Sequence, residues 1–268
     1  GNDPQSYLHF NHFMIWPNGD LSIASPIEIV TYSNSHQFIN KKRCENVGYI
    51  EAITLLNDSL YIIKCMPTPE QLRYRIINHH TGAIINSYDS IINCNRYISS
   101  FTNSFERYEG HIISHGYQSN DILECTLDSS KIRYKINVDN RIPPAGFYTQ
   151  EGKEGMQLIQ EEAEKGYIGH IPDYVESKET ILLSFKGKRE DLNGIALIDK
   201  KDGNARVLEN IKFDDNFRWL PKQFFSLDEG WCAMLMYPED VLKKEEFARR
   251  FPGLDEESNP VLFIGKLR

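Results

Sequence analysis

Two short stretches of the sequence place an aromatic residue two positions before a glutamate. They are "GYIEAI", with Tyr49 and Glu51, and "DYVESK", with Tyr174 and Glu176. Two carboxylates that lie within about 5–10 Å of each other can serve as general acid and general base in glycoside cleavage. The same carboxylates can instead form ion pairs that stabilise the fold. Their chemistry therefore depends on the elements that position them.

Two further stretches place an arginine directly before an aromatic residue. They are "NRYISS", with Arg96 and Tyr97, and "FRWLPK", with Arg218 and Trp219. Guanidinium groups, carboxylates and aromatic faces together suit a polar organic ligand such as a glycan or a peptide. The candidate ligand-binding set is Glu51, Arg96, Tyr97, Glu176, Arg218 and Trp219. The sequence has no GxSxG, Walker, GxGxxG or EF-hand motif, so we expect no catalytic residue and no cofactor.

A metal site is not expected either. His111 and His115 in "HIISH" have the spacing of a helical zinc site, but the surrounding residues favour a strand, on which four residues span ~13 Å. The five cysteines form no CxxC pair. Cys65, Cys125 and Cys232 lie in apolar, strand-like runs, which predicts buried thiols.

The composition is that of a globular protein with many aromatic residues. The net charge is −8, so we expect no nucleic-acid partner and no non-specific attraction to anionic membranes. Short basic clusters such as Lys41-Lys42-Arg43 are interpreted as solvated turns. No apolar run approaches the ~20 residues of a membrane span, and no signal peptide is visible.

Four hairpin turns recur along the chain: "VTYSNSHQFI", "IINHHTGAII", "CTLDSSKIRY" and "LIDKKDGNARVL". They are spaced by 46, 49 and 72 residues, and the long interval contains a helical insertion near 151–166. A unit of four short strands in about 40–50 residues is the size of a propeller blade. Five units are expected, at 11–45, 50–90, 96–140, 167–212 and 217–268.

The predicted fold is therefore an all-β propeller in a single domain, 1–268. A second helical insertion is expected at 238–251, with Pro238 in its first turn. The apolar terminal stretch "NPVLFIGKLR" predicts a strand that closes the ring by pairing with a blade from the other end of the chain. The first strand of each blade lines the channel of a propeller, so the candidate set is expected at a channel mouth.

Four segments of the sequence resemble six-bladed β-propeller proteins abundant in Bacteroidetes, related to NHL-type and TolB-type propellers. "GNDPQSY" is similar to their GxGPxEY segment, with Asp3 and Ser6 in place of Gly and Glu. Residues 119–144 resemble NDxIYxLxxxxxxxxYxIDFGxxxxP, and "YVESKETILLSF" resembles VxESxxYIxxxF. "SNPVLFIGKLR" resembles the terminal DNPVLxxxKLK. The resemblance implies six blades, one of which would be trimmed from this chain.

The resemblance also implies a secreted lipoprotein, hence a periplasmic or outer-membrane-associated location, with a lipid anchor outside this chain. The biochemical activity of the family's members is mostly unassigned, so the resemblance implies no particular activity for this chain. We expect a non-catalytic envelope protein that binds a glycan, peptide or protein partner through a propeller face. The alternative is a hydrolase or lyase that acts on a carbohydrate or lactone, with Glu51 and Glu176 as acid and base. For the channel residues the pattern favours another interpretation, in which arginine and glutamate pair with each other as a structural wall. A third possible function is a purely structural scaffold, which predicts no pocket and a flat apolar patch.

Overall fold

The computed structural model describes most of the chain. The described residues are 10–44, 47–65, 72–90, 105–115, 120–138, 141–144, 146–150, 152–169, 171–209, 211–214, 217–221, 224–243 and 245–267. Their contacts form two compact units. Unit 1 comprises 1–105, 110–170 and 187–189, and unit 2 comprises 106–109, 171–186 and 190–268. The single-domain organisation stays a prediction.

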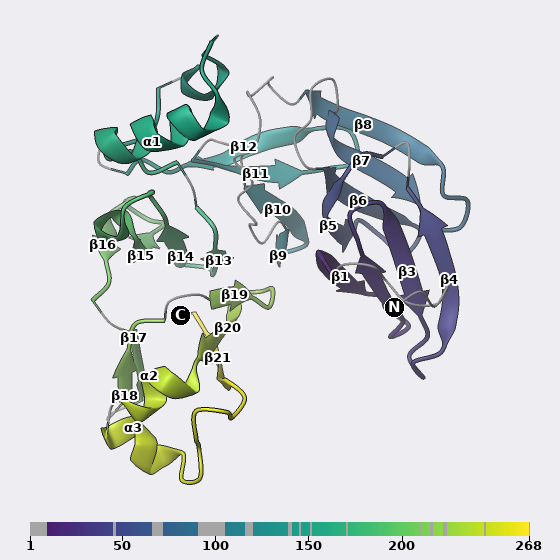
Figure 1. Ribbon diagram of the computed structural model, residues 1–268. Coiled ribbons are helices and arrows are strands. Elements are labelled where there is room, and N and C mark those ends of the chain that lie inside the picture. Colours follow the sequence, from purple (N-terminus) through teal and green to yellow (C-terminus); the bar gives the residue numbers. More distant parts are fainter. Residues whose placement is uncertain are drawn as a thin grey trace. The chain divides into compact units, whose positions relative to one another are not determined.

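The first two sheets are antiparallel meanders in which each strand pairs with the next one along the chain (Figure 1). The first sheet contains β1 (His12–Ile15), β2 (Leu21–Ala24), β3 (Glu28–Tyr32) and β4 (Phe38–Arg43). The second contains β5 (Ile50–Leu55), β6 (Leu60–Cys65), β7 (Leu72–Asn78) and β8 (Ile84–Ser90). Short polar turns produce this order because they return the chain directly beside the strand it has just left.

The third sheet has the order β12-β11-β10-β9. Its strands are β9 (Glu106–Tyr108), β10 (His111–His115), β11 (Asp121–Cys125) and β12 (Ser130–Lys135). The short helix η1 (Phe147–Thr149) and helix α1 (Gly155–Lys165) follow, which confirms the first helical insertion. A capping box between Glu154 and Gln157 begins α1, and Gly166, with φ of 66°, ends it in the left-handed conformation that glycine favours.

Unit 2 contains β9 and the remaining strands. The fourth sheet is β13 (Tyr174–Glu176), β14 (Thr180–Phe185), β15 (Gly194–Asp199) and β16 (Ala205–Val207), with η2 (Glu190–Leu192) before β15. A hairpin of β17 (Ile211–Asp214) and β18 (Phe217–Trp219) follows. The last sheet is β19 (Phe224–Ser226), β20 (Trp231–Met236) and β21 (Val261–Lys266). Successive meanders of this size are the blades of an all-β propeller, and the described residues contain five of them.

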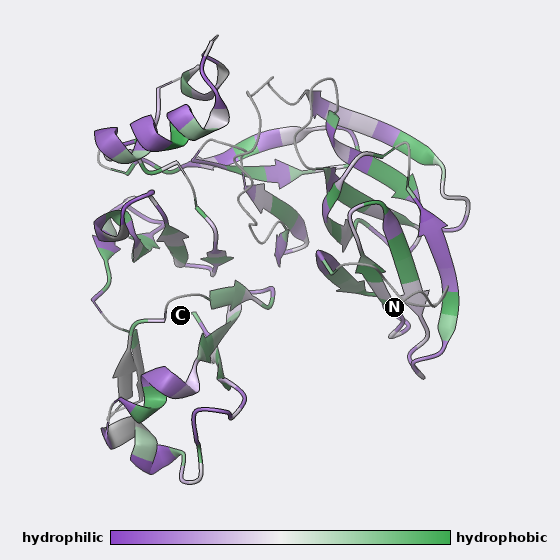
Figure 2. Cartoon of the chain, in the orientation of Figure 1, coloured by the Kyte–Doolittle hydropathy of each residue, from purple (hydrophilic) through white to green (hydrophobic). Residues whose placement is uncertain are grey.

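The apolar strand runs are buried on two faces. In β6, Ile63 joins a cluster with Met14 and Ile29 of the first sheet, whereas its neighbour Ile62 joins a cluster with Ile112 of the third. Adjacent strand residues point to opposite faces. The "LYII" run of β6 therefore packs against a different sheet on each side. In Figure 2 hydrophobic colour runs through inner strands such as β3, whereas α1 is mostly hydrophilic.

The second helical insertion forms two helices instead of one, α2 (Pro238–Leu242) and α3 (Glu245–Arg250). Val241 is fully buried, and Phe251 packs against the same apolar cluster. A single straight helix would separate these two residues by about 15 Å along its axis. The break between α2 and α3 lets both side chains reach one core.

The C-terminal strand pairs along its whole length. β21 lies antiparallel to β20, from Trp231 opposite Lys266 to Met236 opposite Val261. This partner belongs to the same sheet and precedes the helical insertion. Residues 1–9, at the other end of the chain, lie outside the described residues, so the closure of the ring stays a prediction.

Candidate functional site

Glu51 lies on the first strand of the second sheet, within an irregularity of the ladder. Ile50 pairs with Cys65 and Ala52 pairs with Lys64, so Glu51 is the extra residue of a β-bulge. A bulge re-aims the side chain it carries. The Glu51 carboxylate lies 3.8 Å from the Lys64 ammonium, and the two side chains are 8% and 2% exposed. Burial lowers the pKa of Lys64 to about 8, against the opposing effect of Glu51.

Glu176 lies on the first strand of the fourth sheet and is 2% exposed. Its carboxylate accepts hydrogen bonds from the Tyr174 hydroxyl at 2.7 Å and from the Lys200 ammonium at 2.6 Å. Lys200 also donates to the carbonyl of Ser177 and lies 4.9 Å from the centre of the Tyr108 ring. The Glu176 carboxylate therefore already has two hydrogen-bond donors, Tyr174 and Lys200.

Each glutamate has a lysine partner within its own unit, Glu51 in unit 1 and Glu176 in unit 2. Arg96 and Tyr97 lie outside the described residues. Arg218 and Trp219 belong to β18, which pairs with β17, and their side chains are not among those described. The channel-mouth set and the acid–base pair stay predictions.

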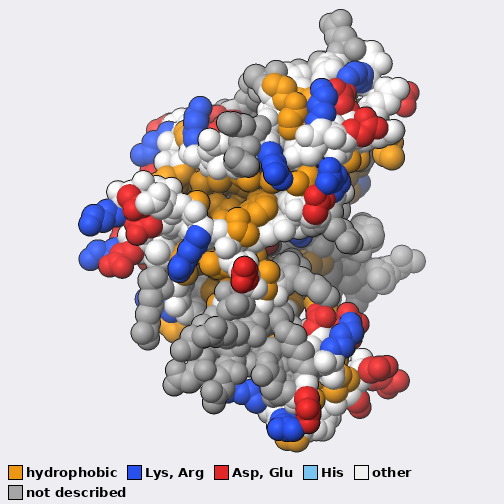
Figure 3. All heavy atoms as spheres, turned by 90° about the vertical axis from the view of Figure 1, so that its left-hand side faces the viewer, with side chains coloured by type: hydrophobic (Ala, Val, Ile, Leu, Met, Phe, Trp, Pro, Cys, Tyr) orange, Lys and Arg blue, Asp and Glu red, His pale blue; other side chains and the backbone are white. Residues whose placement is uncertain are grey.

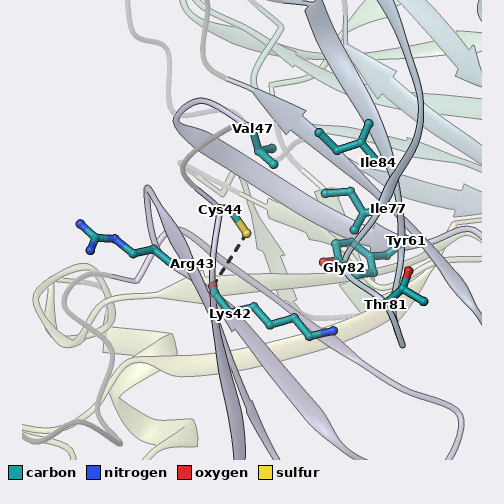
Figure 4. Close-up of a pocket in the computed structure, with 9 residues that line it drawn as sticks. All are labelled: Lys42, Arg43, Cys44, Val47, Tyr61, Ile77, Thr81, Gly82 and Ile84. Atoms are coloured by element: carbon teal, nitrogen blue, oxygen red, sulfur yellow. Dashed lines mark hydrogen bonds between the residues drawn. The ribbon is translucent and has the colours of Figure 1, made fainter.

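A pocket of about 680 Å³ opens in unit 1 between the first sheet and the β7–β8 hairpin (Figure 4). This volume lies within the ~300–1,000 Å³ range of small-molecule sites. The lining residues are Lys42, Arg43, Cys44, Val47, Tyr61, Ile77, Thr81, Gly82 and Ile84. We call it the β4–β7 pocket.

The deep wall of the β4–β7 pocket is apolar. Val47, Ile77 and Cys44 are 4%, 2% and 8% exposed, and they belong to the core cluster shared by the first two sheets. Ile84, which is 40% exposed, continues this wall at the surface. Gly82, with φ of 72°, has no atom within 4 Å of the place where a side chain would begin. The apolar wall is therefore buried at its inner end and exposed at the hairpin.

The charged groups of the described pocket lining are hydrogen-bond donors, and the Thr81 hydroxyl accepts from the backbone N–H of Ala83. The Tyr61 residue is 2% exposed, and its hydroxyl has no hydrogen-bond partner among the described residues, although it is not one of their fully buried unpaired atoms. The Lys42 ammonium donates to the carbonyl of His79, which leaves further N–H groups available, and Arg43 lies exposed beside it. Figure 4 shows Lys42 extending toward the hairpin residues and Arg43 pointing away from them. None of the nine described lining residues is acidic.

Burial shifts the pKa of two ionisable groups next to the apolar wall, Lys42 and Cys44. It lowers the pKa of Lys42, and it raises the pKa of Cys44 to about 11. The Cys44 thiol is therefore protonated at neutral pH, and it donates to the carbonyl of Lys42 (dashed line in Figure 4). A thiol in this state is a packing group and not a nucleophile.

The sequence interpretation missed this pocket. Lys41-Lys42-Arg43 is not a solvated turn: it is the end of β4, where Lys42 pairs with Ile29 and Arg43 with Glu28. Lysines are common on outer strands, where they discourage further strand pairing. The alternation in "FINKKR" after the hairpin turn was the available signal. Tyr61 was hidden in an apolar run that correctly predicted a buried strand.

The described part of unit 2 has a smaller pocket of about 340 Å³, lined by Tyr108, Glu109, Ser177, Lys178, Glu179, Glu229, Lys266 and Leu267. Its lysines and glutamates offer both signs of charge. Within the described ranges, no group of three or more His, Cys, Asp or Glu side chains is placed to hold a metal ion. Over those same ranges, no helix has the length and apolar character needed to cross a membrane.

The blades and their order define an all-β propeller protein. The profile of the DUF5128 family, a 6-bladed β-propeller, matches residues 1–226. The chain belongs to this family, which confirms the expected fold class. No curated protein matches the sequence.

Two solved structures are similar over nearly the whole chain. A Bacteroides fragilis protein, provisionally named as exported, has a TM-score of 0.74 at 11% identity and covers 100% of this chain and 80% of its own. A DUF4221 member from Bacteroides vulgatus has a TM-score of 0.53 at 10% identity, with 99% and 81% covered. Identities this low show the fold alone.

Proposed function

We propose that this propeller is a non-catalytic binding protein of the bacterial envelope that takes a small organic ligand in the β4–β7 pocket. The observation that carries the proposal is the pocket of about 680 Å³, one of whose lining residues, Tyr61, has a hydroxyl without a hydrogen-bond partner among the described residues. A ligand that accepts a hydrogen bond from this hydroxyl would gain about 0.5–3 kcal/mol, with the larger values for a charged acceptor.

The envelope assignment rests on likeness. The resemblance to NHL-type and TolB-type propellers and the exported name of the Bacteroides fragilis protein both support it. In this proposal a lipid anchor outside the given chain attaches the propeller to the membrane. Fractionation of cells that express the full-length gene, with a reporter for acylation, tests the assignment.

A thermal-shift screen with glycans, peptides, carboxylates, amines and nucleosides tests the binding function. At least one class should raise the midpoint of unfolding of the wild type. Thr81→Trp, an exposed change at the mouth of the pocket, should abolish that shift. Ser129→Trp is the matched control, because Ser129 is an exposed hairpin residue of unit 1 outside the pocket. A shift that survives Thr81→Trp, or no shift with any class, would refute the proposal.

A further inference from the structure

The charge around the β4–β7 pocket differs from that of the whole chain. The protein has a net charge of −8, and Figure 3 shows basic and acidic side chains interspersed over one face. The described lining of the pocket has Lys42 and Arg43 but no carboxylate. The neighbouring Lys41 is 3.5 Å from Glu28, so it lies within an ion pair of its own. The described lining of the pocket is thus basic on an acidic protein, and it favours an anion.

The donors and the wall favour different parts of one ligand. The Tyr61 hydroxyl and the Lys42 ammonium can both donate to a carboxylate oxygen, and charge-assisted hydrogen bonds are about twice as strong as neutral ones. Val47, Ile77 and Ile84 present aliphatic surface. A glycan would favour an aromatic platform more open than a ring that is 2% exposed.

On the basis of the proposed function, we infer that the ligand of the β4–β7 pocket is an aliphatic monocarboxylate, of the fatty-acid type. Its carboxylate accepts from Tyr61 and Lys42, and its hydrocarbon chain lies along Val47, Ile77 and Ile84. Arg43 at the mouth contributes long-range attraction. The anion also compensates the charge of Lys42, which its partial burial disfavours.

The test is isothermal titration calorimetry with three ligands of equal chain length: octanoate, octanol and octylamine. Octanoate should bind most tightly. A series from hexanoate to decanoate should gain about fourfold in affinity per added methylene, because each buried methylene contributes to transfer from water.

Two variants assign the contacts. Tyr61→Phe should weaken octanoate at least about tenfold, without a change in the unfolding midpoint, since the hydroxyl has no described partner to lose. Tyr49→Phe, at an exposed tyrosine outside the pocket, is its control. Lys42→Gln should reduce the preference for octanoate over octanol. Lys135→Gln, at an exposed lysine on the last strand of another blade, should leave that preference unchanged.

The outcomes separate the two proposals. If octanol or octylamine binds as tightly as octanoate, or if Tyr61→Phe has no effect on octanoate, the carboxylate inference is wrong while the binding function stands. If the three ligands fail but the broad screen finds a ligand that Thr81→Trp blocks, the same conclusion holds. If no ligand binds in either experiment, both proposals fail.

Discussion

Glu51→Gln should destabilise the protein strongly, because it leaves the Lys64 ammonium buried without its carboxylate. The two charges are 3.8 Å apart with side chains 8% and 2% exposed. At an effective dielectric constant of about 20, that distance corresponds to an attraction of about 4 kcal/mol. Breaking a buried ion pair typically costs about 3–5 kcal/mol. We expect the free energy of unfolding to fall by that amount at pH 7, measured by urea denaturation with tryptophan fluorescence.

The lowered pKa of Lys64 determines how the stability of the protein changes with pH. Lys64 in the folded protein has its pKa lowered to about 8 from 10.5, so the unfolded chain binds more protons between these values and stability increases with pH there. Removal of Glu51 lowers the folded pKa further and moves the lower end of this window down. The deficit of Glu51→Gln should therefore shrink at pH 9.5, where the folded variant holds Lys64 neutral.

Lys64→Met and the double variant Glu51→Gln/Lys64→Met complete a double-mutant cycle with Glu51→Gln. A buried pair replaced by apolar groups is often neutral or stabilising, so Glu51→Gln/Lys64→Met should recover most of the loss. The control is Glu245→Gln, whose partner Arg249 is 75% exposed and whose ion pair should contribute less than about 1 kcal/mol. A cost below about 1 kcal/mol for Glu51→Gln, or a double variant no more stable than it, would refute this reasoning.

Three further predictions concern other buried groups. Lys200→Met should lower the free energy of unfolding by about 3 kcal/mol, because it leaves the buried Glu176 carboxylate without its lysine partner. Lys201→Met, at the exposed neighbour, should leave the free energy of unfolding unchanged in the same urea titration. Iodoacetamide at pH 7.5 should leave the Cys44 thiol unlabelled in the folded protein and label it in urea, as measured by peptide mass spectrometry. Rapid labelling of Cys44 in the folded protein would contradict its raised pKa of about 11. Burial raises the pKa of Asp173 to about 6 from 3.8, so between these pH values the folded state binds one proton more than the unfolded chain and stability falls as pH rises. Asp173→Asn should therefore flatten the plot of unfolding free energy against pH between pH 4 and 6. An unchanged slope would rule out this assignment.

The blades were predictable because their signal is local. Turn residues between apolar runs determine where each strand ends, and "HIISH" reads as a strand from its own neighbours, as β10 confirms. The helices were also predictable, from the polar run of α1 and from Pro238. The break between α2 and α3 was not, since it depends on Val241 and Phe251 meeting in one core.

The site was less predictable because its contacts come from different strands. The position of Glu51 and Glu176 on first strands followed from the repeats. Their lysine partners did not, since the Glu51 bulge shifts the register opposite Lys64 and no residue pattern marks it. Lys42 and Tyr61 are 19 positions apart and meet at one pocket only after two sheets pack.

The central claim is that the β4–β7 pocket receives an aliphatic carboxylate, and methyl spectra observe this most directly. Octanoate is titrated into protein labelled with ¹³C at isoleucine Cδ1, and chemical shifts are followed by NMR. The methyls of Ile77 and Ile84, which line the pocket, should shift and saturate, while that of Ile195 in unit 2 stays in place. Unchanged Ile77 and Ile84 resonances at saturating octanoate would contradict the account.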